Sequence, residues 1–371
     1  MRVERIGLRD FRNYEAAEVE LAAGLTVVTG ANGAGKTNLL EALYFGCTAR
    51  SPRTSNEREL VRRGGDGVAR VVIDLAGPDA EHRIEVGFHP GEAKHMRVDG
   101  SPVESLAASQ ARPLVSVFLP ERLELVKGAP AARRAHLDQL VAALWPSRAE
   151  TRASYSRALA QRNALVARVR AGAAGPAALD AWDAELARHG IRLMADRSEA
   201  VDGLRPLFAE LGARLGLPGS VELRYRPRSP ATDAEGLAAE LAERRAADID
   251  RGFTAHGPHR DELQLMLEGA SLRSYGSQGQ QRAALLALLF AERTLLAERR
   301  ARLPLMLLDD VMSELDAERR ELLADLLRAG GQSVITTTEP EHVPGAGLAG
   351  GGGLVRVESG TIGASPREVA A

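Results

Sequence analysis

The sequence has few of the residues that mark secreted or membrane proteins. It contains a single cysteine, Cys47, so no intramolecular disulfide can form, which suits a reducing compartment. No apolar run approaches the roughly 18 residues that a membrane-spanning helix needs. The first five residues alternate charged with apolar side chains and lack the apolar core of a signal peptide. We therefore expect a cytoplasmic protein that does not enter a membrane.

An excess of charge of one sign is also absent. Lysine and arginine together number 48, aspartate and glutamate 50, and the net charge is −2. These numbers exclude a chain that is basic over its whole surface, but they allow a local positive face for nucleic acid. Only Lys36, Lys94 and Lys127 are lysines. A codon bias towards arginine explains this composition, so the number of arginines is by itself poor evidence for DNA binding.

The apolar content is sufficient for a sizeable core, at 44% of 371 residues, and the length suits two domains. Strand-like runs dominate to about residue 130. A block rich in Ala, Leu, Arg and Glu follows, with apolar residues spaced along one face of a helix. The α/β pattern returns after Gly252. We predict an α/β lobe of residues 1–130 plus 253–371, a mostly helical lobe of residues 131–252, and no long coiled coil.

A phosphate-binding motif lies in the first part of the chain. It follows the β-branched run Leu25–Thr29, which is typical of a buried strand, and precedes a helical pattern. In such a P-loop, backbone N–H groups and the helix N-terminus surround phosphates. We expect Lys36 to contact the β- and γ-phosphates of ATP and Thr37 to bind Mg²⁺. The motif matches G-x-x-x-x-G-K-[ST] at every position: Gly30, Ala31, Asn32, Gly33, Ala34, Gly35, Lys36 and Thr37.

A P-loop ATPase also needs an acidic residue at the end of a parallel strand. The apolar run 305–308 ends in Asp309 and Asp310. Asp309 is expected to hold Mg²⁺, directly or through water, and Asp310 to polarise the attacking water. Lys36 and these two acids are therefore the candidate catalytic residues.

A third motif, Ser277-Gln278-Gly279-Gln280, begins a strongly helical segment. A Ser and a Gly at a helix N-terminus can bind an anion; the alternative is that Ser277 is only an N-cap. Before an acidic strand, the motif resembles the signature of ABC-type ATPases, which contacts the γ-phosphate of ATP held by a second subunit. The resemblance makes Ser277, Gly279 and Gln280 candidate nucleotide contacts. Residues 313–316 then stand at the place of the D-loop, a dimer-interface element.

Over essentially its whole length the chain resembles the bacterial RecF family. The family implies an ABC/SMC-type ATPase head with a second, helical lobe. The segments that carry the resemblance are 8–14, 53–55 with 59–60, 124–130 with 133–134 and 137–138, residues of the helical lobe (Tyr155, Leu159, 161–163 and 182–183), 257–261, and 307–310 with 313–316 and Arg319.

The resemblance also implies a function. RecF-like proteins bind ATP and Mg²⁺, form an ATP-dependent homodimer, and bind double-stranded, gapped and single-stranded DNA. They hydrolyse ATP weakly, as a switch, and help to load recombinase at single-strand gaps with mediators such as RecR. Their roles lie in DNA repair, recombination, replication restart and the SOS response. Arg12 and Asn13 are candidate adenine contacts on the same ground.

The sequence departs from the general ABC pattern in ways that suit slow hydrolysis. Gly276 and Gln278 replace the usual Leu and Gly of the signature, and Asp310 stands where most ABC proteins have Glu. Residues 334–338 contain no switch histidine. A transporter ATPase subunit is the main alternative, but the large helical lobe argues against it. A P-loop kinase or nuclease-linked ATPase is a third. His256 and His259 could lie near the nucleotide or serve structure alone.

Overall fold

The computed structural model describes residues 1–65, 67–77, 79–106, 109, 111–344 and 352–363. Contacts divide the chain into two units, Met1–Arg122 with Ala301–Ala371, and Leu123–Arg300. The sequence had grouped residues 253–300 with the first lobe. By contacts they belong with the helical unit, because β10 (Glu262–Leu267) pairs with β9 (Val221–Arg226) and α9 (Gln278–Arg300) packs along α5 (Asp180–Arg214).

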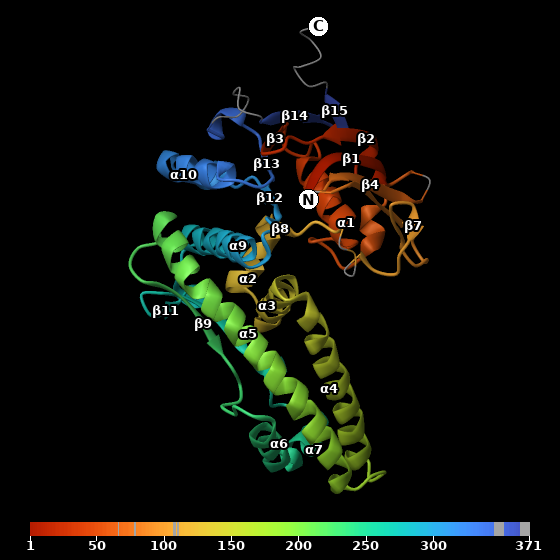
Figure 1. The fold of residues 1–371 in the computed structure, drawn as a ribbon, viewed down its shortest axis with the longest axis vertical. Coiled ribbons are helices and arrows are strands. Elements are labelled where there is room, and N and C mark those ends of the chain that lie inside the picture. The colour runs from red at the N-terminus through yellow and green to blue at the C-terminus, as the bar shows by residue number, and fades with distance from the viewer. Residues whose placement is uncertain (66, 78, 107–108, 110, 345–351, 364–371) are drawn as a thin grey trace. The chain divides into compact units, whose positions relative to one another are not determined.

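The first unit contains two six-stranded sheets, with the first and last parts of the chain side by side in one of them (Figure 1). In that sheet the order is β15-β14-β3-β13-β12-β8, and every pairing from β14 to β8 is parallel. Its strands are β3 (Leu25–Thr29), β8 (Val115–Phe118), β12 (Leu305–Asp309), β13 (Ser333–Thr337), β14 (Gly353–Glu358) and β15 (Thr361–Gly363).

The second sheet is antiparallel, in the order β2-β1-β4-β5-β6-β7. Helix α1 (Lys36–Thr48) contacts strands of both sheets and buries Leu39, Leu40, Leu43 and Phe45. One apolar core therefore joins the two sheets through this helix. The strands are β1 (Arg2–Phe11), β2 (Tyr14–Glu20), β4 (Ala69–Ala76), β5 (Glu81–Phe88), β6 (His95–Val98) and β7 (Ser101–Pro102).

The burial patterns explain why the two sheets differ. All residues of β3, β12 and β13 are buried, as expected for parallel strands covered on both faces. Strand β4 instead alternates between buried and more exposed positions, as an antiparallel strand does when one face meets solvent. The continuous apolar runs in the sequence thus correspond to the central parallel strands β3, β12 and β13.

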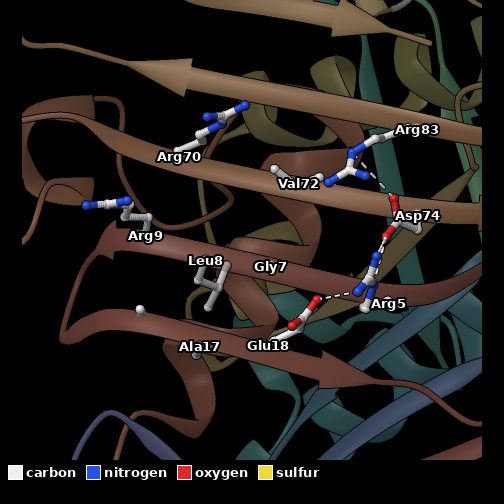
Figure 2. A pocket seen from close by; sticks show the side chains of 11 residues that line it. Arg5, Gly7, Leu8, Arg9, Ala17, Glu18, Arg70, Val72, Asp74 and Arg83 are labelled. Atoms are coloured by element: carbon white, nitrogen blue, oxygen red, sulfur yellow. Dashed lines mark hydrogen bonds and ion pairs between the residues drawn. The ribbon is translucent and has the colours of Figure 1, made fainter. Parts of the chain in front are cut away.

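The outer face of the antiparallel sheet carries a shallow hollow of about 550 Å³ (Figure 2). Arg5 pairs there with Glu18 and Asp74, and Arg83 also approaches Asp74. Because acids accompany these arginines and the hollow has no glycine loop, it lacks the features of a nucleotide site. Its lining residues are Arg5, Gly7, Leu8, Arg9, Ala16, Ala17, Glu18, Arg70, Val72, Asp74 and Arg83.

The second unit is mostly helical, with a small antiparallel sheet in the order β11-β10-β9. Long helices α4 and α5 pack against each other, and α5 also contacts α6. Among the described residues, no helix is both long enough and apolar enough to cross a membrane. The remaining elements are α2 (Glu124–Lys127), α3 (Pro130–Leu144), α4 (Ala149–Arg170), α6 (Ala234–Glu243), α7 (Arg245–Arg251), β11 (Ala270–Ser271) and α8 (Leu272–Tyr275).

A buried ionic network ties this helical unit together. Arg162 on α4 is 0% exposed. Its guanidinium donates to Asp183 at 2.6 Å, to Asp248 at 2.8 Å and to the Thr254 hydroxyl at 2.6 Å. The network therefore links α4, α5, α7 and the loop that follows α7. Buried charges of this kind are tolerated only while they are paired.

We expect Arg162→Ala to lower the free energy of unfolding by about 3–5 kcal/mol, because it leaves buried carboxylates without their partner. Urea unfolding followed by circular dichroism measures the change. Arg188→Ala is the matched control, since Arg188 forms a pair with Glu185 on the surface of α5. Equal unfolding midpoints for the two variants would show that the buried network does not hold the unit together.

Candidate nucleotide-binding site

The loop between β3 and α1 has the backbone geometry of a phosphate cradle. Gly35 has φ +120°, and a Cβ on it would lie 2.6 Å from Asn13 Nδ2. A Cβ on Gly30 would lie 2.2 Å from the carbonyl oxygen of Val357. Glycine is therefore required at both ends of the loop. Helix α1 begins at Lys36, so its unpaired N–H groups face the loop.

Lys36 folds back into this loop. Its Nζ donates to the carbonyl oxygens of Gly30 at 2.7 Å and Ala31 at 3.0 Å. Burial lowers the pKa of Lys36, while the charges of Asp310 and Asp309 act in the opposite direction. The ammonium group thus lies inside the loop and donates to two neutral carbonyl oxygens. A charged phosphate oxygen would be a stronger hydrogen-bond acceptor than either carbonyl.

Thr37 and Asp309, which the sequence analysis expects to share a magnesium ion, lie in contact although 272 positions separate them. The Thr37 hydroxyl lies 2.9 and 2.8 Å from the two carboxylate oxygens of Asp309. Asp309 is 7% exposed, and burial raises its pKa against the opposing effect of hydrogen bonds from Thr336 and Thr37. The structure brings together one hydroxyl and one carboxylate, both oxygen ligands that Mg²⁺ accepts.

These two groups fit a magnesium ion that takes its other ligands from phosphate and water. Within the described part of the chain, no group of three or more His, Cys, Asp or Glu residues could hold a metal by itself. Mg²⁺ commonly binds through one or two carboxylates together with substrate phosphates, which is the arrangement available here.

Asp310 follows directly, exposed and with φ +46°. Its amide donates to the Thr336 hydroxyl at 3.0 Å, and the same hydroxyl donates to Asp309 at 2.7 Å. Thr336 on β13 thus fixes both acids. The sequence reasoning missed it, having noted only that this strand has no histidine. Residues 313–316 form the turn into α10 (Ala317–Arg328), which Asp316 caps.

Two neighbouring side chains support the loop and were also missed. Asn13 Nδ2 donates to the carbonyl of Ala34 at 3.0 Å, and the Tyr14 hydroxyl donates to that of Gly35 at 3.0 Å. Asn38 donates to Asn13 Oδ1 at 2.8 Å. The sequence offered residues 8–14 as a family segment, with Asn13 as a candidate adenine contact, but did not indicate that Asn13 and Tyr14 support the loop. The adenine contact expected of Arg12 and Asn13 stays a prediction.

The signature segment belongs to the second unit. Ser277 N donates to Gln280 Oε1 at 2.9 Å, and Gln280 N donates to Ser277 Oγ at 3.2 Å, which is a reciprocal capping box. Ser277 is therefore an N-cap, as the simpler interpretation expected. Ser277 and Gly279 are nevertheless exposed, and Tyr275 beside them is 80% exposed. The start of α9 is therefore open to solvent.

The two histidines that the sequence left open have partners inside the second unit. His256 pairs with Glu240. His259 Nε2 donates to the Thr254 carbonyl at 3.0 Å, so Nδ1 accepts from the Tyr155 hydroxyl at 2.7 Å. Burial lowers the pKa of His259 to about 4. These bonds favour a structural role for both rings.

Strand, glycine loop, helix and buried acid define a P-loop nucleotide-binding protein, and its fold resembles the SMC heads. One solved SMC head bound to a ScpA domain is 17% identical with a TM-score of 0.60, covering 100% of this chain and 99% of that one. Residues 2–347 match the family model described as RecF/RecN/SMC N terminal domain.

The chain belongs to the RecF family. It is 37% identical to the DNA replication and repair protein RecF of Kineococcus radiotolerans, over 93% of this chain and 95% of the relative. It is 39% identical to the DNA replication and repair protein RecF of Streptomyces avermitilis, over 94% of this chain and 96% of the relative. A solved structure of "the recombination mediator protein RecF-ATPrS in RecFOR pathway" is 28% identical, with a TM-score of 0.85 over 97% of each chain.

The buried acid makes a prediction about stability. Because burial raises the pKa of Asp309, its protonated form is favoured in the fold, and stability is lost as pH rises through that raised pKa. We expect Asp309→Asn to raise the melting temperature of the nucleotide-free protein at about pH 7.5, with a smaller gain near about pH 4. Scanning calorimetry at both pH values measures it. The control is Asp325→Asn, which replaces an exposed acid and should leave the melting temperature unchanged at both pH values. An increase in the melting temperature of Asp309→Asn that is the same at both pH values would contradict the prediction.

Proposed function

We propose that this protein is an ATP-dependent DNA-binding clamp of DNA repair, recombination and replication restart. The observation that carries the proposal is the contact of Thr37 with Asp309 beside a glycine cradle, in a chain of the RecF family. A solved relative, 27% identical with a TM-score of 0.85, is described as RecF-ATP in the RecFOR pathway, which supports ATP as the nucleotide. Lys36 would hold its phosphates.

Mg²⁺ would be held by Thr37 and Asp309 and would neutralise charge on the phosphates. Thr336 keeps the Asp309 carboxylate oriented toward Thr37, and Asp310 lies next to it to polarise an attacking water. Aspartate is shorter than the glutamate of most ABC proteins. We therefore expect weak, DNA-stimulated hydrolysis that serves as a switch.

The exposed signature segment favours a homodimer that closes on ATP. Ser277, Gly279 and Gln280 of one copy would complete the phosphate site of the other, since helix N-termini bind anions. In this proposal residues 1–130 plus 253–371 work as the ATPase lobe and residues 131–252 as the helical lobe, although by contacts residues 253–300 pack with the helical unit. Closure would create a surface for double-stranded, gapped and single-stranded DNA, bound mainly through its phosphates.

Family membership supports the wider role. We propose cytoplasmic action with mediators such as RecR to load recombinase at single-strand gaps, including during the SOS response. A transporter ATPase is disfavoured, because the relatives described above are DNA replication and repair proteins.

Sedimentation with and without ATP and Mg²⁺ tests the clamp directly. We expect Asp310→Asn to accumulate an ATP-dependent dimer, because slower hydrolysis prolongs the closed state. Lys36→Ala should remain monomeric and lose ATP-dependent binding of gapped DNA, since it lacks the phosphate-binding ammonium. A Lys36→Ala protein that still dimerises and binds DNA with ATP would refute the proposal.

The two glycines of the signature segment give a sharper test. Nothing lies within 4 Å of a Cβ added to Gly279, whereas one added to Gly276 would lie 2.7 Å from the Leu272 carbonyl. We expect Gly279→Ala to leave the monomer as stable as wild type but to weaken ATP-dependent dimerisation. Gly276→Ala should lower the melting temperature. If Gly279→Ala dimerises normally, no partner group approaches this helix start closely.

A further inference from the structure

The turn that follows α7 in the second unit exposes an aromatic ring. Phe253 is 42% exposed, and the proposed mechanism does not use it. Its backbone is nevertheless held on both sides, because Phe253 N donates to the carbonyl of Asp248 at 3.2 Å and Thr254 N donates to Asn163 Oδ1 at 2.8 Å. A single exposed apolar side chain is ordinary on a protein surface, so the groups around the ring decide what it can do.

Arginines without acidic partners stand close to this ring in space or in sequence. The guanidinium carbon of Arg260 lies 5.7 Å from the ring centroid, which is a cation–π distance. Arg170 NH1 lies beside Gly252, where an added Cβ would be 2.9 Å away, and Arg251 precedes that glycine. All three arginines are exposed, and within the part of the chain that the structure describes none of their side chains forms an ion pair or a hydrogen bond.

The charge around the ring is positive. Asp248 on α7 is engaged with Arg162 inside the unit, which leaves Asp250 as the exposed acid of that helix. The charge of Arg260 also acts on its neighbourhood, because it adds to the effect of burial in lowering the pKa of His259. Unpaired guanidinium groups beside an exposed ring fit an anionic ligand that also has flat apolar faces.

Single-stranded DNA combines these two properties. Each of its bases has a π-face that stacks on aromatic side chains, and each of its phosphates carries a negative charge. In duplex DNA the bases are already stacked on their neighbours, whereas the phosphates remain accessible. An aromatic ring therefore favours unpaired DNA, while arginines that contact only phosphates accept single strands and duplexes alike.

We propose that Phe253 stacks on an unpaired base of single-stranded DNA, with Arg260 flanking the ring and with Arg170 and Arg251 on the adjoining phosphates. The inference rests on the proposed DNA binding and adds the group that distinguishes a single strand from a duplex. All four residues belong to the second unit, so one subunit carries the whole site and its occupation needs no ATP.

Fluorescence anisotropy with nucleotide-free, full-length protein tests the inference on two labelled oligonucleotides of equal length. One is an oligothymidylate and the other consists of abasic tetrahydrofuran residues, so that both carry the same phosphates. We expect the wild type to bind the oligothymidylate roughly tenfold more tightly, because stacking requires a base. Phe253→Ala should bind both strands equally, and Phe253→Trp should keep the preference. Arg251→Ala should weaken the binding of both strands alike, because it removes a phosphate contact.

Leu303→Ala is the matched control, because Leu303 is an apolar residue of the first unit that is 40% exposed. It should bind both oligonucleotides as the wild type does. Equal affinity of the wild type for the two strands, or a Phe253→Ala protein that keeps the preference, would overturn the inference and leave the ring to a protein partner. A wild type that binds no DNA even with ATP would instead refute the proposed function. Melting temperatures of all variants show whether each one is folded.

Discussion

The contact between Thr37 and Asp309 is the interaction on which the site depends. It joins the first turn of α1 to the end of β12, and it exists only because β3, β13 and β12 pair in parallel. Parallel pairing brings the carboxyl ends of these strands to one edge, where the glycine loop and both acids stand. A shift in the pairing register of these strands would separate the Thr37 hydroxyl from the Asp309 carboxylate. The P-loop and the acidic strand end would each remain, but they would no longer form one site.

Neighbouring side chains fix the positions of the acids and of the glycine loop around this contact. Thr336 bonds to Asp309 and to the amide of Asp310, so the middle strand fixes the acids beside it. Asn13, in the turn between β1 and β2, and Tyr14, the first residue of β2, bond to carbonyls of the loop. The antiparallel sheet thereby contributes to a site built mainly on the parallel one. Burial raises the pKa of Asp309, because keeping its carboxylate charged inside the fold costs free energy.

The helical unit is organised differently, around buried charge. Arg162 with Asp183 and Asp248 crosses between helices, and Arg197 bonds to Asp138 and Asp261. Guanidinium groups can satisfy several carboxylates at once, which fits a chain whose basic residues are almost all arginine. Arg162 and Arg197 are therefore used inside the protein and are not available to bind DNA.

The sequence by itself determined the P-loop motif, the acids at 309 and 310, the signature-like motif at 277–280 and the RecF resemblance, because each is written in consecutive residues. It also placed the main strands and the helical block, from apolar runs and periodicity. Only the tertiary structure decided that residues 253–300 group with the helical unit, since that depends on pairing of β10 with distant β9. Thr336 carries no local motif, and the contact of Asn13 with the loop is not evident from its family segment. Both roles arise from bonds to residues that are distant along the chain, which no spacing rule encodes.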